Sequence, residues 1–203
     1  MIMDNLKIKG NASIYCKSCF YSVSDYLKDD YEYRFTKGVN KLVGEIDSGV
    51  WAISYLLSMY KKNSLDFILY EELNIDVDGK KIPLSEFLKY SCYLDESYSL
   101  FSSKKTVKQL VSKGLKLNKR KETTDDIRNL FEMADFRFER PLCEVGHEIF
   151  KGMAAIGYCY GKEVFCFPWL SNMRFEAFHG HMTKTLEVLE SLEKIVILPM
   201  GRG

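Results

Sequence analysis

Two glycines five residues apart, directly after an apolar stretch, constrain the fold of this chain more than any other feature of its sequence. Residues 39–43 are expected to form a short strand, and Gly44 and Gly49 follow it with the spacing of a phosphate-binding loop, G-x-x-x-x-G-K-[ST]. The backbone N–H groups of such a loop wrap a phosphate, and the loop joins the strand to a helix. The sequence therefore predicts an α/β fold with this loop at the end of a strand.

The side chains that normally act in such a loop are absent. Val50 occupies the position of the lysine that reaches the β- and γ-phosphates, and Trp51 occupies the position of the hydroxyl that holds Mg²⁺. We predict a remnant phosphate loop that keeps its backbone shape without catalytic side chains. Its residues are Gly44, Glu45, Ile46, Asp47, Ser48, Gly49, Val50 and Trp51.

Composition excludes several classes of protein. The chain has 203 residues, enough for one domain, and its 29 Lys and Arg against 28 Asp and Glu give a net charge of +1. This balance argues against a dedicated nucleic-acid or membrane-surface protein. Because no apolar run reaches the length of a membrane span and no signal-peptide core is present, we expect a cytoplasmic protein without direct membrane insertion. The six cysteines are expected to be reduced, buried thiols.

Hydrophobic periodicity predicts an antiparallel first third followed by alternating helices and strands. Strands are expected within 5–23 and over 31–35, 39–43, 67–69, 75–77, 91–94, 163–167 and 195–198. Helices are expected over 50–60, 83–88, 106–113, 125–133, 148–160 and 174–193, with Thr123-Thr124 able to cap the fourth of them. Asp78-Gly79 predicts a hairpin turn, and residues 116–121 a solvated cationic loop. The strand at 163–167 is apolar on both faces, which is typical of a central parallel strand.

The order of these elements resembles the nucleotide-binding domain of ATP-binding cassette (ABC) transporters over nearly the whole chain. Five collinear segments carry the resemblance, although each is weak alone: residues 37–49, 74–82, 91–107, 140–148 and 154–156. It implies a P-loop NTPase-like mixed sheet with flanking helices and an antiparallel N-terminal β portion. It also implies a single domain over residues 1–203, in which about residues 95–150 form an inserted helical subdomain.

Each functional position of the family pattern is changed in this sequence. Asp95 takes the place of the coupling glutamine. Residues 146–148 (Gly-His-Glu) take the place of the signature Ser-Gly-Gly, and this replacement would turn a carboxylate toward a phosphate. Residues 167–169 (Phe-Pro-Trp) replace the Asp-Glu pair that holds Mg²⁺ and the attacking water, and 197–200 lack the switch histidine. Because phosphoryl transfer depends on positioning and charge neutralisation, we predict a pseudo-ATPase with no catalytic residues.

The resemblance implies a non-hydrolysing subunit or scaffold. Its expected partner is an active ABC ATPase subunit or a membrane permease of a bacterial export, immunity or modification system, or a second copy of itself, and it would reach the membrane only through a partner. The alternative is a nucleotide-sensing protein that holds ATP weakly through the N–H groups of residues 45–49. No other cofactor and no nucleic acid are expected.

Other candidate sites are weaker. The imidazoles of His179 and His181 have no further ligands at zinc spacing, so no metal site is predicted; together with His147 and Glu148 they leave open a repurposed catalyst. The pair Cys16 and Cys19 has redox spacing, but the two residues point to opposite faces of an expected strand, which indicates ordinary thiols.

Two aromatic groups have alternative interpretations. Phe20 and Tyr21 lie near the position where an ABC domain stacks adenine, and core or edge packing is the competing interpretation. The apolar run 169–178, preceded by Phe165 and Phe167, would mark a protein interface if it is exposed. The carboxylates of Glu144, Glu148 and Glu163 show no arrangement that supports acid–base chemistry.

Overall fold

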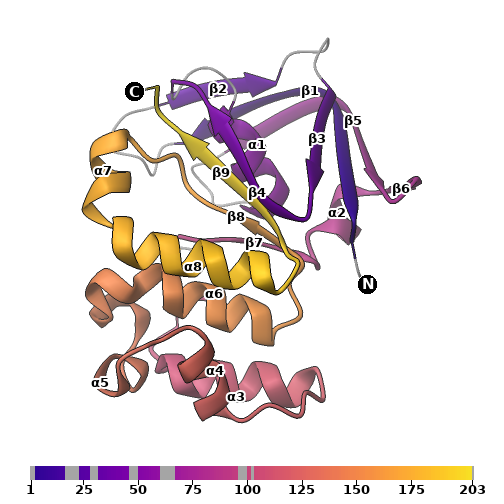
Figure 1. Cartoon of the computed structure of the whole chain (residues 1–203). Helices are drawn as coiled ribbons and strands as arrows, with labels where there is room; N and C mark the ends of the chain where they lie inside the picture. The colour runs from indigo at the N-terminus through magenta and orange to yellow at the C-terminus, as the bar shows by residue number, and fades with distance from the viewer. Residues whose placement is uncertain are drawn as a thin grey trace.

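The computed structural model describes residues 3–16, 23–27, 32–45, 50–59, 67–95, 100–101 and 103–202. These residues form an antiparallel sheet, a parallel sheet and a set of helices; in Figure 1 the antiparallel sheet lies at the top, α1 lies among the strands, and α3, α6 and α8 lie below the parallel sheet. This is the mixed α/β architecture with an antiparallel N-terminal portion that the sequence predicts. The division into one domain with a helical insertion over about 95–150 remains a prediction.

The antiparallel sheet is built around one long strand. Strand β1 (Asn5–Cys16) pairs with β2 (Val23–Leu27), β3 (Glu32–Thr36) and β5 (Phe67–Val77), and β5 pairs with β6 (Lys80–Ile82). The expectation of separate strands at 67–69 and 75–77 is wrong. The chain is extended throughout β5, because nearly the whole strand finds hydrogen-bonding partners on β1, with one register shift at Asn11/Ala12.

The turn between β5 and β6 confirms the predicted hairpin. Asp78 and Gly79 both have positive φ, +50° and +81°, which a two-residue hairpin turn requires. The carboxylate of Asp78 also accepts the backbone N–H of Asn5 at 2.8 Å, so the hairpin turn is held against the start of β1.

The parallel sheet carries the loop of interest at one end. Its strands are β4 (Gly38–Val43), β9 (Ile195–Met200), β8 (Val164–Cys166) and β7 (Ser91–Tyr93), in the order β4-β9-β8-β7. All three pairings are parallel. Strand β8 is flanked on both sides and all three of its residues are buried, which confirms the prediction of a central parallel strand.

The helices cover both faces of the parallel sheet. The helical elements are α1 (Val50–Met59), α2 (Leu84–Phe87), α3 (Val107–Leu117), α4 (Thr124–Leu130), α5 (Asp135–Phe138), η1 (Leu142–Glu144), η2 (Gly146–Glu148), α6 (Ile149–Cys159), α7 (Asn172–Ala177) and α8 (His179–Ser191). Capping boxes begin α3 at Thr106 and α4 at Thr123, the second as predicted.

Two helix predictions need correction. Helix α3 continues to Leu117, so Lys116 is helical and not part of a loop. The single helix expected over 174–193 is two helices, α7 and α8, separated at Phe178. The ring of Phe178 packs edge-on against Phe150 of α6 at 5.8 Å, and this tertiary contact accompanies the break.

The two faces of the parallel sheet belong to two cores. Val164, Cys166, Ile195 and Ile197 face α1 and the antiparallel sheet. Phe165 and its neighbours on the other face pack against α3, α6 and α8, which Figure 1 shows as the lower layers. Because successive residues of a strand point to opposite faces, both cores take residues from β8 and β9. The sheet is therefore rigidly held from both sides.

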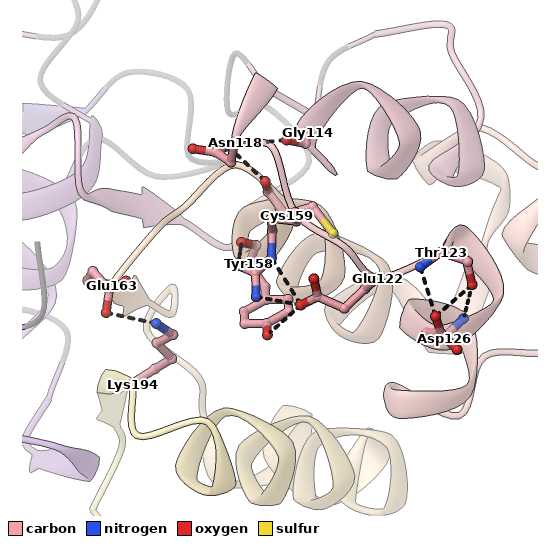
Figure 2. A network of polar contacts seen from close by, with 10 residues as sticks. Gly114, Asn118, Glu122, Thr123, Asp126, Tyr158, Cys159, Glu163 and Lys194 are labelled. Carbon is pink, nitrogen blue, oxygen red and sulfur yellow. Dashed lines mark hydrogen bonds and ion pairs between the residues drawn. The ribbon is translucent and has the colours of Figure 1, made fainter. Parts of the chain in front are cut away.

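A polar network lies where α3 and α6 end (Figure 2). The amide of Asn118 donates to the carbonyl oxygens of Gly114 and Cys159, which joins the end of α3 to the end of α6. Arg120 bonds Glu122 at 2.8 Å and lies 3.8 Å from the ring centroid of Tyr158. The expected solvated loop is therefore wrong at Arg120, whose side chain is bound internally.

Candidate functional site

The carboxyl ends of the four parallel strands meet at one edge, where ligands bind in open α/β sheets. Strand β4 ends at Val43 and α1 begins at Val50, so the chain runs from strand to helix across the predicted remnant phosphate loop. Gly44 and Glu45 follow β4, and Val50 and Trp51 begin α1; Ile46, Asp47, Ser48 and Gly49 lie outside the described residues. The buried Gly44 donates its N–H to the Met200 carbonyl at 2.9 Å, which holds the start of the loop beside β9.

The end of β8 is part of the hydrophobic core. Phe167, the first residue after the strand, has no exposed surface and packs against Phe150 with 5.5 Å between ring centroids. Its carbonyl accepts a hydrogen bond from the Ser54 hydroxyl of α1. An aromatic ring fixed inside the core therefore occupies the sequence position from which the resemblance would place a metal-binding carboxylate.

Trp169 joins the ends of two strands that are not neighbours. Its indole Nε1 donates to the carbonyl oxygen of Gly44 at 3.0 Å, so the end of β8 is linked to the first residue of the remnant phosphate loop. The ring lies close to Gly201, where a Cβ atom would come within 3.3 Å of Trp169 Cζ2. Sequence analysis identifies Trp169 as part of the segment that replaces the expected Asp-Glu pair, but nothing in the sequence predicts this hydrogen bond.

The region that the resemblance aligns with the signature motif is held by internal contacts. Glu148 is 8% exposed, and its Oε2 accepts the backbone N–H of Ala134 at 3.1 Å. The expectation that this carboxylate faces a phosphate is therefore wrong: it serves as a hydrogen-bond acceptor at the start of α5. Arg137 donates to the carbonyl of Val145 in the same region.

The histidines pair differently from the sequence expectation. The ring of His181 stacks on that of His147, with 6.2 Å between centroids and an 8° interplanar angle, whereas His179 packs edge-on against Phe175. Partial burial, followed by the nearby Lys151 charge, lowers the pKa of His181. Within the described part of the chain, no group of three or more His, Cys, Asp or Glu residues could hold a metal ion.

Three of the four cysteines with described side chains are buried, as predicted. Burial raises the pKa of the Cys92 and Cys159 thiols to about 12 and that of Cys166 higher still, so these thiols stay protonated and unreactive. The prediction is wrong for Cys143, which is exposed on η1. Cys19 lies outside the described residues, so the pairing with Cys16 is not described.

The apolar run 169–178 is not a continuous exposed patch. Leu170 is buried, as are Phe165 and Phe167 before the run, and Met173 is the exposed large apolar side chain among the described residues of the run, at 78%. Phe20 and Tyr21, the candidate adenine-stacking residues, lie outside the described residues. The helices that the structure describes include none that is both long and apolar enough to cross a membrane.

Comparison with solved structures identifies the fold. The structure superposes on a protein assigned as the ATP-binding protein of an ABC transporter from Pyrococcus furiosus, with a TM-score of 0.62, 17% identity and coverage of 98% of this chain and 92% of that one. A dimeric ATP-binding cassette in a post-hydrolysis state with ADP and phosphate bound matches with a TM-score of 0.61, 10% identity and coverage of 98% and 88%. The chain has the fold of an ABC-transporter ATP-binding domain.

A third similar structure is much larger than this chain. A bacterial Atm1-family ABC exporter with ATP bound matches with a TM-score of 0.57 and 10% identity, over 100% of this chain and 35% of the exporter chain. No protein-family model matches the sequence, and no curated protein matches it. The likeness is therefore one of fold, and the chemistry must be argued from the residues of this chain.

The described residues at the positions where the resemblance expects phosphate and Mg²⁺ ligands do not fit a bound Mg²⁺–nucleotide. Mg²⁺ prefers carboxylate oxygens and waters, but Phe167 is a buried phenyl ring and the Trp169 indole donates its only N–H to Gly44. Val50, at the lysine position, is 8% exposed and belongs to the hydrophobic core. These described positions therefore supply neither the cation nor the metal-binding carboxylate that support phosphoryl transfer.

Proposed function

We propose that this chain is an ABC-type domain that does not hydrolyse ATP and acts as a subunit of a larger assembly. One observation carries the proposal. The segment after β8 provides the buried phenyl of Phe167 and the Gly44-bound indole of Trp169 in place of two carboxylates. Both aromatic rings are fixed by contacts that also hold the sheet edge together.

The energetic argument concerns the transition state of phosphoryl transfer. Its charge is neutralised by Mg²⁺ and a lysine, and the attacking water is positioned by a nearby side chain. Loss of each such group costs several kcal/mol of transition-state stabilisation, and each 1.4 kcal/mol is about a tenfold loss of rate. With the metal carboxylate, the lysine and the hydroxyl all replaced, the remaining backbone donors are too few to support turnover.

The proposed partner is a second ATP-binding domain or a membrane permease. Among the similar structures, one cassette is dimeric and another domain is part of an exporter. An inactive domain can still supply half of a dimer interface, because shape complementarity does not depend on the catalytic side chains. The chain would then contribute binding surface while an active partner turns over nucleotide.

The experiment is a phosphate-release assay on the purified chain with ATP and Mg²⁺, with an active ABC domain assayed in parallel. We expect release at the level of the protein-free blank. ATP turnover that co-elutes with this chain in gel filtration, after contaminating ATPases have been removed, would overturn the proposal. The proposed partner is tested by gel filtration of the chain mixed with an active ATP-binding domain or permease, which should show a stable complex. Elution of the chain alone would contradict the proposed partnership.

A nucleotide-sensing role is supported by a different observation. The ten-residue helix α1 follows the remnant phosphate loop directly, and the N-terminus of a helix attracts anions. Such a protein would hold ATP through backbone N–H groups without turnover. Titration calorimetry with ATP separates the two functions: saturable heat without phosphate release supports sensing, and no heat at millimolar nucleotide removes it.

A further inference from the structure

One end of α3 carries a concentration of positive charge that the proposed function does not use. We define the cationic patch as the exposed residues Lys113, Lys116, Leu117, Lys119 and Lys121. It lies in the lowest layer of Figure 1, away from both sheets, and Leu117 within it is 61% exposed. The overall charge of +1 therefore conceals a strongly positive region.

Helix geometry places the two helical lysines of the patch on the outer side of α3. The buried residues Leu110, Val111, Gly114 and Leu115 belong to the core shared with α6. At 100° per residue, Lys113 and Lys116 fall on the opposite side, whereas Leu117 lies at the margin of the buried face, two turns after Leu110 and one turn after Lys113. Lys119 and Lys121 continue the charge just beyond the end of the helix, so the exposed Leu117 has lysines before and after it in the sequence.

The lysines of the patch are not neutralised by the part of the chain that the structure describes. No side-chain hydrogen bond or ion pair joins the ammonium group of any of the four to another described residue. Lys108, on the same helix, does pair with Glu139, with 2.6 Å between Nζ and Oε1. Glu122, the carboxylate adjacent in sequence, is bound to Arg120 at 2.8 Å. The four charges are therefore available to an external anion.

The composition of the patch discriminates between anionic partners. Nucleic-acid surfaces rely on arginines that bind phosphates and bases and on aromatic rings that stack on bases. Here the guanidinium of Arg120 is engaged by Glu122 and the ring of Tyr158, and residues 113–121 contain no aromatic side chain. Clustered lysines around an exposed leucine suit an anionic bilayer, where headgroups attract the ammonium groups and the apolar side chain enters the interface.

We infer that the cationic patch adsorbs this chain to a surface of anionic phospholipids. The attraction does not depend on nucleotide or on the remnant phosphate loop. Each lysine near an anionic leaflet contributes about fivefold in partition, so the four together contribute roughly 600-fold. Because the charges are exposed, the attraction is screened within about 10 Å at moderate ionic strength and weakens as salt is added.

The test is cosedimentation of the full chain with vesicles of phosphatidylcholine alone and of phosphatidylcholine with phosphatidylserine. The test variant replaces Lys113, Lys116, Lys119 and Lys121 by Gln. The matched control replaces four exposed lysines of the antiparallel sheet, Lys7, Lys9, Lys80 and Lys81, by Gln, which changes the net charge equally. Thermal unfolding of each variant confirms that it folds.

We expect wild type and the control to sediment with phosphatidylserine vesicles, less so at high salt, and the test variant to stay in solution. Wild type that stays in solution, a test variant that still binds, or a control that loses binding equally would overturn the proposal. Tighter binding of wild type to duplex or single-stranded nucleic acid, lost in the same variant, would overturn it in favour of a different polyanion.

A second variant tests the apolar component. Leu117→Ser removes the exposed side chain without changing charge, and we expect a several-fold weaker partition because the apolar area entering the interface is lost. Unchanged binding would overturn the insertion of Leu117. Neither result depends on whether the chain hydrolyses ATP, so failure here is distinguishable from failure of the proposed function.

Discussion

The two edges of the parallel sheet differ in what holds them. At the amino edge, Lys194 before β9 pairs with Glu163 before β8 at 2.8 Å, with side chains only 13% and 17% exposed. Lys37, before β4, contacts the carboxylates of Asp4 and Glu193. Ion pairs therefore connect the strands at this edge, and Figure 2 shows the Lys194–Glu163 pair beside the polar network around Tyr158.

The carboxyl edge is held by aromatic rings and backbone groups. Phe167 is buried, Trp169 bonds the Gly44 carbonyl, and Gly44 bonds Met200. Open parallel sheets bind their ligands at this edge, and the buried Lys194–Glu163 ion pair lies at the other one. The comparison teaches that, among the described residues, charged side chains join the strands at the amino edge, whereas aromatic rings and backbone hydrogen bonds hold the carboxyl edge.

The largest loss of stability is expected when a carboxylate is introduced at the carboxyl edge. Phe167→Asp would place a carboxylate in a fully buried site against Phe150, and we expect a loss of about 4 kcal/mol or more of unfolding free energy. Urea denaturation followed by circular dichroism measures it. Phe167→Leu is the matched control, with a loss of about 1.5 kcal/mol. Equal stability of the Asp variant and wild type would show that this position is not core.

Removing one partner of the buried ion pair at the amino edge should lower the unfolding free energy. Lys194→Met leaves the Glu163 carboxylate unpaired and removes the ammonium 5.9 Å from the Tyr158 ring centroid, so we expect a loss of about 2 kcal/mol. The same denaturation measurement applies. The double variant Lys194→Met/Glu163→Gln should recover part of the loss, and additive effects would argue against coupling.

Removing the indole hydrogen bond should have a smaller effect. Trp169→Phe keeps an aromatic ring but leaves the Gly44 carbonyl without its donor, at a cost of about 1 kcal/mol. Hydrogen exchange of the Gly44 and Gly201 amides should also accelerate if the ring anchors this edge. Unchanged stability and unchanged exchange would mean that the contact contributes nothing to it.

The smallest effect concerns pH. The hydrogen bond from Arg120 lowers the pKa of Glu122, so this carboxylate stabilises the fold above its unfolded-state pKa of about 4.3 and loses that effect as pH falls through the lower folded-state value. Wild type should exceed Glu122→Gln by about 0.5 kcal/mol at pH 7, because the pair is solvent-screened. The difference should vanish in acid. A difference that grows in acid would contradict the assignment.

Local patterns in the sequence predict the elements that position the site. The strand–loop–helix order over 39–60, the turn at Asp78-Gly79 and the central strand β8 all follow from short-range periodicity and turn chemistry. The carboxylates of Glu71 and Glu72 interrupt the hydrophobic pattern inside β5, which hides its continuity. The extended partner β1 overrides that local signal.

Contacts between distant residues are what the sequence alone could not supply. Trp169 and Gly44 are 125 positions apart, and no motif relates an indole to a loop carbonyl. Likewise Glu148 looks like a signature-motif substitute until its carboxylate is seen to accept from Ala134. The sequence predicts which positions form the candidate site. The hydrogen-bonding partners of their side chains could not be predicted, because they depend on how the strands assemble.

The position of Trp169 gives the protein a built-in optical reporter. The chain has two tryptophans: Trp169 bonds the first residue of the remnant phosphate loop, and Trp51 is the last residue of that loop and the second of α1. Tryptophan emission, excited separately from the 13 tyrosines, therefore comes from residues that bond to this loop or belong to it. Any molecule that reaches this loop, or any partner that covers it, can be followed by emission without attaching a label.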